Sequence, residues 1–104
     1  RVLIMSHAFT VRRNFDGLEA TFHGYANGIF YKCFGCEDFD KGLSGSNEER
    51  VFKKQFVQNA LLKALSSSEI RTYPDKNRAK ELANFLANEM TYCVDSDEFT
   101  VCFW

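Results

Sequence analysis

The stretch Leu18–Cys36, LEATFHGYANGIFYKCFGC, contains the strongest turn signal in the chain. Asn27 and Gly28 lie between two runs of strand-forming residues. Asn-Gly favours a two-residue type I′ turn, because both central positions of that turn need a positive φ. The sequence therefore predicts a β-hairpin whose strands are residues 18–25 and 29–36.

The register of this hairpin divides its side chains between two faces of a sheet. The face expected to be core carries Leu18, Ala20, Phe22, Ile29, Tyr31 and Cys33. The opposite face carries Thr21, His23, Tyr25, Phe30, Lys32 and Phe34. We expect function on this second face, because large aromatic rings left near solvent often mark a contact surface.

A second turn signal precedes the hairpin. Asp16 and Gly17 have the same turn chemistry and predict a connection between a first strand, 1–13, and the strand 18–25. Both turns assign Phe22 to the core face, and a slip of one residue would invert every side chain. The sequence therefore predicts an antiparallel meander of three strands.

The second half of the chain is typical of two helices followed by a strand. Ser46 and Glu49 match a capping box and predict a helix that begins there. Apolar spacing predicts a second helix over about 75–92, and alternation predicts a last strand over 99–103. The predicted fold is α+β, in the order β-β-β-α-α-β, with an antiparallel sheet and two helices packed on one face as a two-layer sandwich. A single domain, 1–104, is expected.

Composition argues against some classes of protein. The formal net charge is -1, whereas proteins that bind nucleic acid mainly through charge usually have a basic balance. No apolar run is long enough to span a membrane. The chain has no initiator Met and no signal peptide, so we expect a processed product.

The chain has four cysteines, which are Cys33, Cys36, Cys93 and Cys102. An even number of cysteines in a short chain favours two disulfides and a secreted protein. Two pairings stay open, 33–93 with 36–102 or 33–102 with 36–93. Zinc ligation by all four is the alternative, although Cys93 and Cys102 lack the close spacing of zinc ribbons. No cofactor and no metal are predicted.

An enzyme is the main alternative to a binding protein. In the predicted register Thr10, His23 and Lys32 form one row across three strands, and Arg12 lies in the next row. An imidazole among cations could act as acid or base in metal-independent RNA cleavage, and aromatic rings on a sheet can stack nucleobases. Enzyme activity stays open and is less favoured than binding, because no phosphate-binding glycine loop or other catalytic motif accompanies these residues.

The segment Tyr31-Lys32-Cys33, a later helix and the near-terminal Cys102 resemble small secreted effectors of plant-pathogenic fungi, especially mildews. Many of those proteins carry a Y-x-C motif and a cysteine near the C-terminus. The resemblance implies a secreted protein with, in many members, a ribonuclease-like fold that lacks the catalytic residues. The predicted architecture is also similar to that of the small α/β killer toxins of fungi.

Together these features predict a secreted, disulfide-stabilised binding protein that acts as an effector or toxin on a host or a competitor. Its expected contact face consists of Tyr25, Phe30, Phe34, His23 and Lys32. The expected partner is a protein, with RNA as the alternative, and a homodimer is predicted through the same uncovered sheet face. The other two hypotheses are a ribonuclease centred on His23 and a zinc-stabilised intracellular interaction module.

Overall fold

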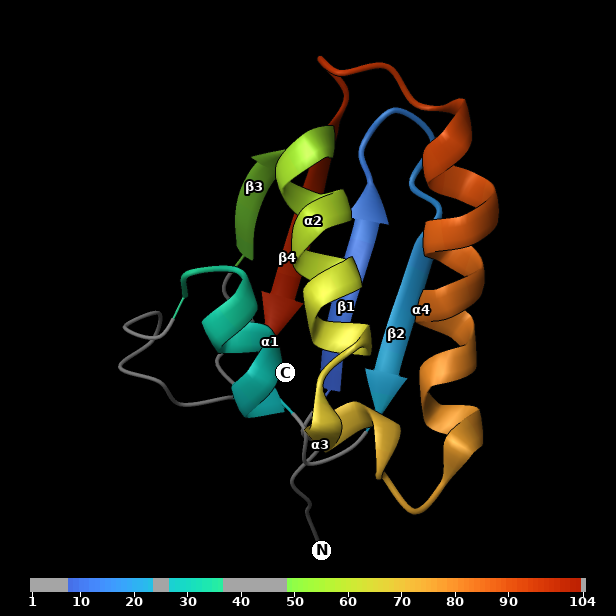
Figure 1. Cartoon of the computed structure of the whole chain (residues 1–104). Coiled ribbons are helices and arrows are strands. Elements are labelled where there is room, and N and C mark those ends of the chain that lie inside the picture. Colours follow the sequence, from blue (N-terminus) through green and yellow to red (C-terminus); the bar gives the residue numbers. More distant parts are fainter. Residues whose placement is uncertain (1–7, 24–26, 37–48, 104) are drawn as a thin grey trace, which may run out of the picture.

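The structure, a computed structural model, describes residues 8–23, 27–36 and 49–103 (Figure 1). Its strands are β1 (Ala8–Arg13), β2 (Glu19–His23), β3 (Glu49–Lys53) and β4 (Glu98–Phe103). Its helices are α1 (Asn27–Cys33), α2 (Lys54–Leu65) and α3 (Ser68–Arg71), followed by the helical run η2 (Lys76–Ala79), α4 (Lys80–Asn84), η3 (Phe85–Glu89) and η4 (Met90–Tyr92). The predicted α+β class is confirmed.

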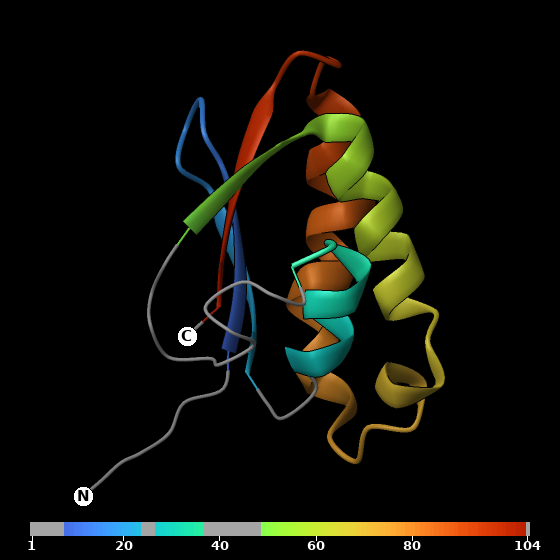
Figure 2. The same cartoon turned by 90° about the vertical axis from the view of Figure 1, so that its left-hand side faces the viewer.

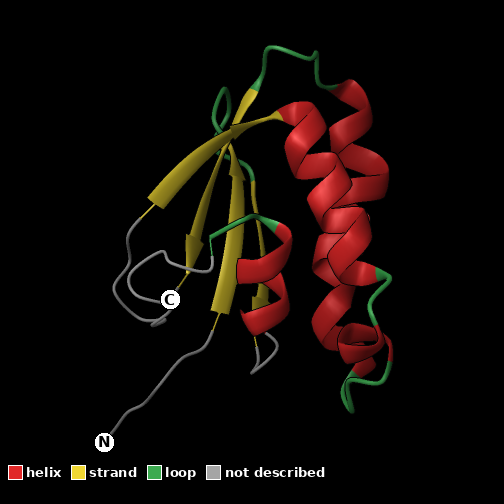
Figure 3. Cartoon of the chain, turned by 60° about the vertical axis from the view of Figure 1, so that its left-hand side comes forward, coloured by secondary structure: helices red, strands yellow, loops and turns green. Residues whose placement is uncertain are grey.

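The strands form one sheet in the order β2-β1-β4-β3. Each neighbouring pair is antiparallel, as predicted for the sheet. The helices of the described ranges all lie on one side of this sheet (Figures 2 and 3). Two layers result, and β2 and β3 are the outer strands. We call the side of the sheet opposite the helices the helix-free face.

The hairpin predicted around Asp16-Gly17 is present, as β1 and β2, with a shifted register. Phe9 lies opposite Phe22, two residues from the predicted pairing. The turn is longer than two residues, because Gly17 takes a φ of 76° and donates its N–H to the Arg13 carbonyl at 2.7 Å. A shift of two residues keeps every side chain on its predicted face. Phe22 is therefore buried and His23 exposed, as predicted.

The hairpin predicted around Asn27-Gly28 is wrong, because Asn27–Cys33 forms the helix α1. Phe30 in α1 and Phe34, which directly follows it, both pack on Phe9 of β1. Their side chains are 0% and 1% exposed, and burial of each ring stabilises the fold by roughly 1.5–3 kcal/mol. This burial outweighs the local turn preference of Asn-Gly.

A glycine cap ends α1. Gly35 has a φ of 67°, and its N–H donates to the Lys32 carbonyl at 3.1 Å. The Cys36 N–H donates to the Tyr31 carbonyl at 2.7 Å. These two bonds form a Schellman motif, which satisfies carbonyl groups that the end of a helix leaves unbonded.

Aromatic rings fill the space between the sheet and the helices. Phe9 of β1 stacks on Phe30 of α1 with ring centres 4.4 Å apart. Tyr31 stacks on Phe103 of β4 with ring centres 3.9 Å apart. The helix α1 therefore packs its aromatic side chains directly on the two central strands.

The element order also differs from the prediction in the second half. Residues 49–53 form the edge strand β3, where a helix was predicted; Ser46 lies outside the described residues. The helix α2 begins only at Lys54. Its buried side chains, Val57, Ala60, Leu61 and Ala64, are spaced along one face of the helix. The described order is therefore β-β-α-β followed by helices and β4, and more than two helices cover the sheet.

The predicted second helix corresponds to the run from η2 to η4, 76–92. Leu82, Phe85 and Met90 are its buried side chains on the sheet side. Residues 85–89 are π-helical. Among the described residues, no helix combines the length and the apolar composition that crossing a membrane requires.

Candidate functional site

The structure separates the residues predicted to form one contact face. Phe30 and Phe34 are core residues, and Lys32 is exposed on α1, in the helical layer. His23 is exposed at the end of β2. Tyr25 lies outside the described residues. The predicted placement of Phe30 and Phe34 on an uncovered sheet face is therefore wrong, and the described members do not form one surface.

The residues of the predicted catalytic row are also apart. His23 lies opposite Ala8, whereas Arg12 lies opposite Glu19. Four residues of extended strand, from Ala8 to Arg12, span roughly 13 Å. Lys32 belongs to the helical layer on the other side of the sheet. The ribonuclease hypothesis stays untested, but its three residues do not converge.

The predicted disulfides are wrong. All four cysteines lie in the described residues, and no disulfide joins any two of them. Cys102 lies opposite Thr10 in β1 and alternates with the core residues Val101 and Phe103, so it faces away from the helices. Cys36 and Cys93 are buried in the core on the helical side. Both proposed pairings are therefore wrong, and so is the expectation that disulfides stabilise this fold.

The described residues also hold no group of three or more His, Cys, Asp or Glu side chains that could bind a metal ion. The separation of the four thiols is the reason that no cysteine cluster forms. The hypothesis of a zinc-stabilised module therefore has no site in this part of the chain.

Cys33 borders a cavity of about 220 Å³ between α1 and α2. The cavity is also lined by Phe56, Asn59, Ala60 and Lys63. Burial raises the pKa of the Cys33 thiol, although the charges of Lys63 and Lys32 act in the opposite direction. Because the thiolate is the reactive form, Cys33 is a poor nucleophile at neutral pH. Among the described residues that line the cavity, Cys33 is therefore not an activated nucleophile.

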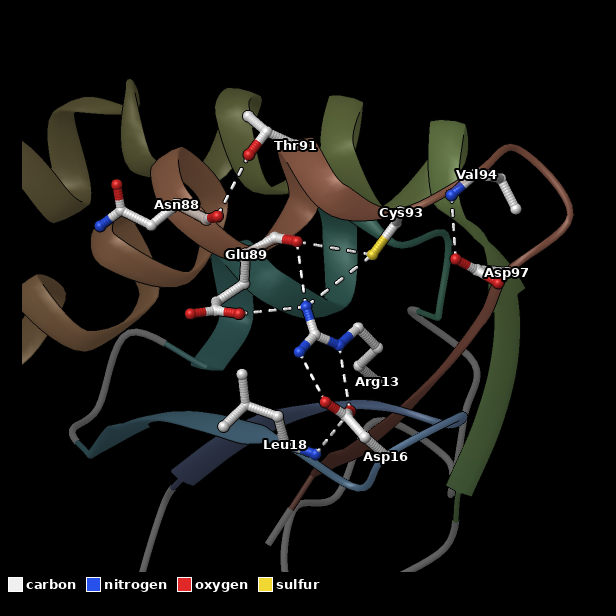
Figure 4. Close-up of polar contacts among 9 residues, drawn as sticks. All are labelled: Arg13, Asp16, Leu18, Asn88, Glu89, Thr91, Cys93, Val94 and Asp97. Carbon is white, nitrogen blue, oxygen red and sulfur yellow. Dashed lines mark hydrogen bonds and ion pairs between the residues drawn. The ribbon is translucent and has the colours of Figure 1, made fainter.

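A buried arginine connects the β1–β2 turn to the end of the helical run (Figure 4). Arg13 is 6% exposed. Its Nε and Nη2 donate to the two carboxylate oxygens of Asp16 at 3.0 and 2.6 Å. Its Nη1 donates to the Glu89 carbonyl at 3.0 Å and lies 3.1 Å from Glu89 Oε1. Nη1 is also 4.0 Å from Cys93 Sγ.

The charges of this cluster support one another. The hydrogen bonds from Arg13 hold the pKa of Asp16 below its ordinary value, and the same bonds raise the pKa of Arg13 above its ordinary value. Because the pKa of Asp16 is lower in the folded chain, its ionised form stabilises the fold above about pH 4. That stabilisation is lost as the pH falls through the folded pKa.

Two segments beside Arg13, the β1–β2 turn and the segment around Cys93, carry large apolar side chains that stay exposed. In the β1–β2 turn, Phe15 is 62% and Leu18 is 39% exposed, and the Arg13 guanidinium lies 4.7 Å from the centre of the Phe15 ring. Tyr92 and Val94, on either side of Cys93, are 80% and 61% exposed. We call Phe15, Leu18, Tyr92 and Val94 the hairpin-end surface. It contains four of the seven large apolar side chains exposed in the described residues.

Hydrogen bonds hold the segment around Cys93 in place. The Val94 N–H donates to Asp97 Oδ2 at 2.9 Å, and the Asp97 N–H donates to the Val94 carbonyl at 3.0 Å. Lys54 Nζ donates to the Cys93 carbonyl at 2.8 Å. The hairpin-end surface therefore lies on turns that are bonded to the rest of the fold.

A groove of about 190 Å³ adjoins this surface between β2 and the helical run. Its lining residues are Leu18, Glu19, Ala20, Glu81, Asn84, Phe85, Asn88 and Glu89. The lining contains three carboxylates and no basic side chain, so its charge favours a cation. One wall includes the π-helical segment 85–89, a geometry often found at functional sites. We call this feature the acidic groove.

The sequence interpretation did not identify this region. One local signal is that Phe15 and Leu18 flank the Asp16-Gly17 turn, where polar residues are usual. Arg13 also lies, by alternation, on the same face of β1 as the core residues Phe9 and Val11, so its charged side chain points toward the helices. Neither signal reveals that Tyr92 and Val94 lie at the same end of the molecule.

Comparison of the chain with protein-family models, with curated proteins and with solved structures found no match. The resemblance to secreted fungal effectors and the secreted location therefore stay predictions. The geometry of the hairpin-end surface and the acidic groove carries the functional inference.

Proposed function

We propose that this chain is a protein-binding module, and that the hairpin-end surface and the acidic groove form its binding site. The observation that supports this most strongly is that Phe15, Tyr92 and Val94 stay exposed although hydrogen bonds fix the segments that carry them. Apolar side chains on bonded turns lose little conformational entropy on binding, so more of the contact energy appears as affinity.

Tyr92 is the best candidate for the central contact. It is the most exposed large apolar side chain of the described residues, at 80%. Tyrosine is common among the few residues that dominate protein interfaces, and truncating such a residue costs about 2 kcal/mol or more. A loss of that size corresponds to a roughly 30-fold weaker affinity.

The acidic groove defines the chemistry of the partner. Glu81 accepts the Thr21 N–H at 2.8 Å, and Glu89 pairs with Arg13. Glu19 forms no ion pair within the described ranges. A bound segment would therefore place an apolar side chain on the hairpin-end surface and a Lys or Arg side chain beside Glu19. The same carboxylates repel phosphate groups, which disfavours RNA at this site.

A library of random peptides selected against the immobilised full chain tests this proposal. Selected peptides should combine an apolar residue with a nearby Lys or Arg. Titration of one such peptide should show binding at least tenfold weaker for Tyr92→Ser and for Glu19→Lys. The matched control is Leu62→Ser, because Leu62 is 50% exposed on α2, away from this site.

Two results would contradict the proposal. One is a selection that yields no peptide with this pattern. The other is a peptide whose affinity falls as much in Leu62→Ser as in Tyr92→Ser. Circular dichroism of each variant establishes that the fold is retained, so that a loss of binding reports on the surface.

A further inference from the structure

The outer edge of β2 is closed by side chains of this chain. Thr21 donates its backbone N–H to Glu81 Oε2 at 2.8 Å. The backbone carbonyl of His23 accepts from Arg78 Nη1 at 2.9 Å. These backbone groups point outward, away from β1, and would otherwise be open to another strand. Covering an edge in this way is a known protection against unwanted pairing.

The outer edge of β3 is different. Because the Lys54 N–H donates to the Asp97 carbonyl at 3.1 Å, alternate residues of β3 bond toward β4. The backbone groups of Glu49, Val51 and Lys53 consequently point outward, except that the Lys53 carbonyl is at the start of α2. No described strand pairs with this side of β3. In Figure 1 β3 lies at the margin of the molecule, across the sheet from α4.

We propose that β3 pairs antiparallel with β3 of a second copy of this chain, about a two-fold axis at Val51. The pairing joins two sheets into one continuous sheet. In this register Val51 lies opposite Val51 of the second copy, and Glu49 lies opposite Lys53. The Val51 residues exchange two backbone hydrogen bonds, and each Lys53 N–H donates to the Glu49 carbonyl of the other copy.

The backbone and the charges select the same register. A shift by one residue would place inward-directed groups of one strand opposite outward-directed groups of the other, so no ladder could form. A shift by two would separate Glu49 from Lys53. A parallel arrangement would instead set Glu49 against Glu49 and Lys53 against Lys53, which is destabilising. The segment 49–53 is thus self-complementary in one arrangement.

Two ion pairs within each copy would line up with the Glu49–Lys53 pairs across the proposed interface. Lys53 Nζ lies 3.1 Å from Glu98 Oε2, and Arg12 Nη1 lies 3.7 Å from Glu49 Oε2. Both pairs are on the helix-free face. Across the proposed interface, Lys53 of one copy, paired with Glu98, would lie beside Glu49 of the other copy, which is paired with Arg12. Charges of alternating sign would follow one another in a row, and the two-fold axis would produce that row twice.

This arrangement differs from the homodimer predicted through the uncovered sheet face. The described part of that face exposes Val51, at 53%, as its large apolar side chain, and otherwise carries small, polar or charged residues. A face of that composition offers little apolar area for stacking two sheets. Pairing along the edge needs little such area, because backbone hydrogen bonds provide the contact.

Charge reversal tests the proposal through the molar mass of the full chain, measured by sedimentation over a range of concentrations. The natural chain should form dimers. Glu49→Lys and Lys53→Glu should each dissociate at concentrations at least tenfold higher than the natural chain, because like charges then oppose each other. An equimolar mixture of the two variants should dimerise again, since each basic position of the first faces an acidic position of the second.

Two further variants separate this interface from general effects of charge or stability. Val51→Pro removes an outward N–H without removing a bond to β4, so it should abolish dimers while circular dichroism stays unchanged. Lys63→Glu, on the exposed side of α2, should leave the dimer intact. The proposal is overturned if the natural chain is monomeric throughout, if either charge variant dimerises like the natural chain, or if their mixture stays monomeric.

Discussion

The two outer strands of the sheet expose their backbones in the same alternating pattern, but only one of them is covered by this chain's described side chains. On β2, Glu81 and Arg78 bond to the outward groups of Thr21 and His23. On β3, the outward groups of Glu49, Val51 and Lys53 border no described strand. Within the described residues, the edge beside α4 is therefore closed, whereas the opposite edge is the one that we propose pairs with a second copy.

The largest expected effect concerns the support of the closed edge. Arg13→Ala should lower the free energy of unfolding by about 2 kcal/mol, because a buried cation loses hydrogen bonds to charged groups. Those bonds hold the β1–β2 turn against the helical run that covers β2. Urea denaturation monitored by circular dichroism measures the change.

Arg12→Ala is the matched control for that change. Arg12 is the neighbouring arginine, and its side chain is 36% exposed with one ion pair at 3.7 Å. Its removal should change the unfolding free energy by less than about 1 kcal/mol. Equal losses in the two variants would show that the contacts of Arg13 do not anchor the turn.

A smaller effect is expected at the closed edge itself. Glu81→Ala removes the acceptor of the Thr21 N–H and should cost about 1 kcal/mol. It should also make β2 available to other strands, so the chain should form species larger than a dimer in sedimentation. Glu69→Ala, on the exposed side of α3, is the control. No increase in size for Glu81→Ala would mean that this side chain does not guard the edge.

The sequence predicted the structure correctly where turn signals agree with the alternation of buried and exposed residues. The β1–β2 hairpin, the burial of Phe22, the exposure of His23 and the final strand all follow from alternation around Asp16-Gly17 and along 99–103. The register was displaced by two residues, because the turn is longer than the two residues predicted and the Arg13 N–H bonds to the Leu18 carbonyl. An even displacement leaves the faces unchanged.

The sequence interpretation failed where a local turn preference competed with tertiary burial. Asn27-Gly28 favours a hairpin, but in the observed helical conformation Phe30 and Phe34 both pack on Phe9 of β1 and are buried. Gly35 was the overlooked signal, since a glycine followed by an apolar residue is typical of a helix C-terminus. The partners of these rings lie in distant strands, so local patterns alone could not weigh the two outcomes.

The candidate site was harder to predict than the fold. The hairpin-end surface joins two turns that are separated by most of the chain, and Arg13 connects them through Glu89 and Cys93. The disulfide prediction was wrong for a related reason. An even count favoured disulfides, whereas the parity of Cys102 directs it away from the core face that holds Cys36 and Cys93. Counting residues does not reveal which side of a sheet they occupy.

Amide hydrogen exchange, followed by NMR on the natural chain at low and high concentration, tests the difference between the two edges most directly. We predict that the Thr21 amide is protected at every concentration, because Glu81 binds it within one molecule. The Val51 amide should exchange freely at low concentration and become protected as dimers form. Protection of Val51 at low concentration, or free exchange of Val51 at concentrations where the chain is dimeric, would contradict the account.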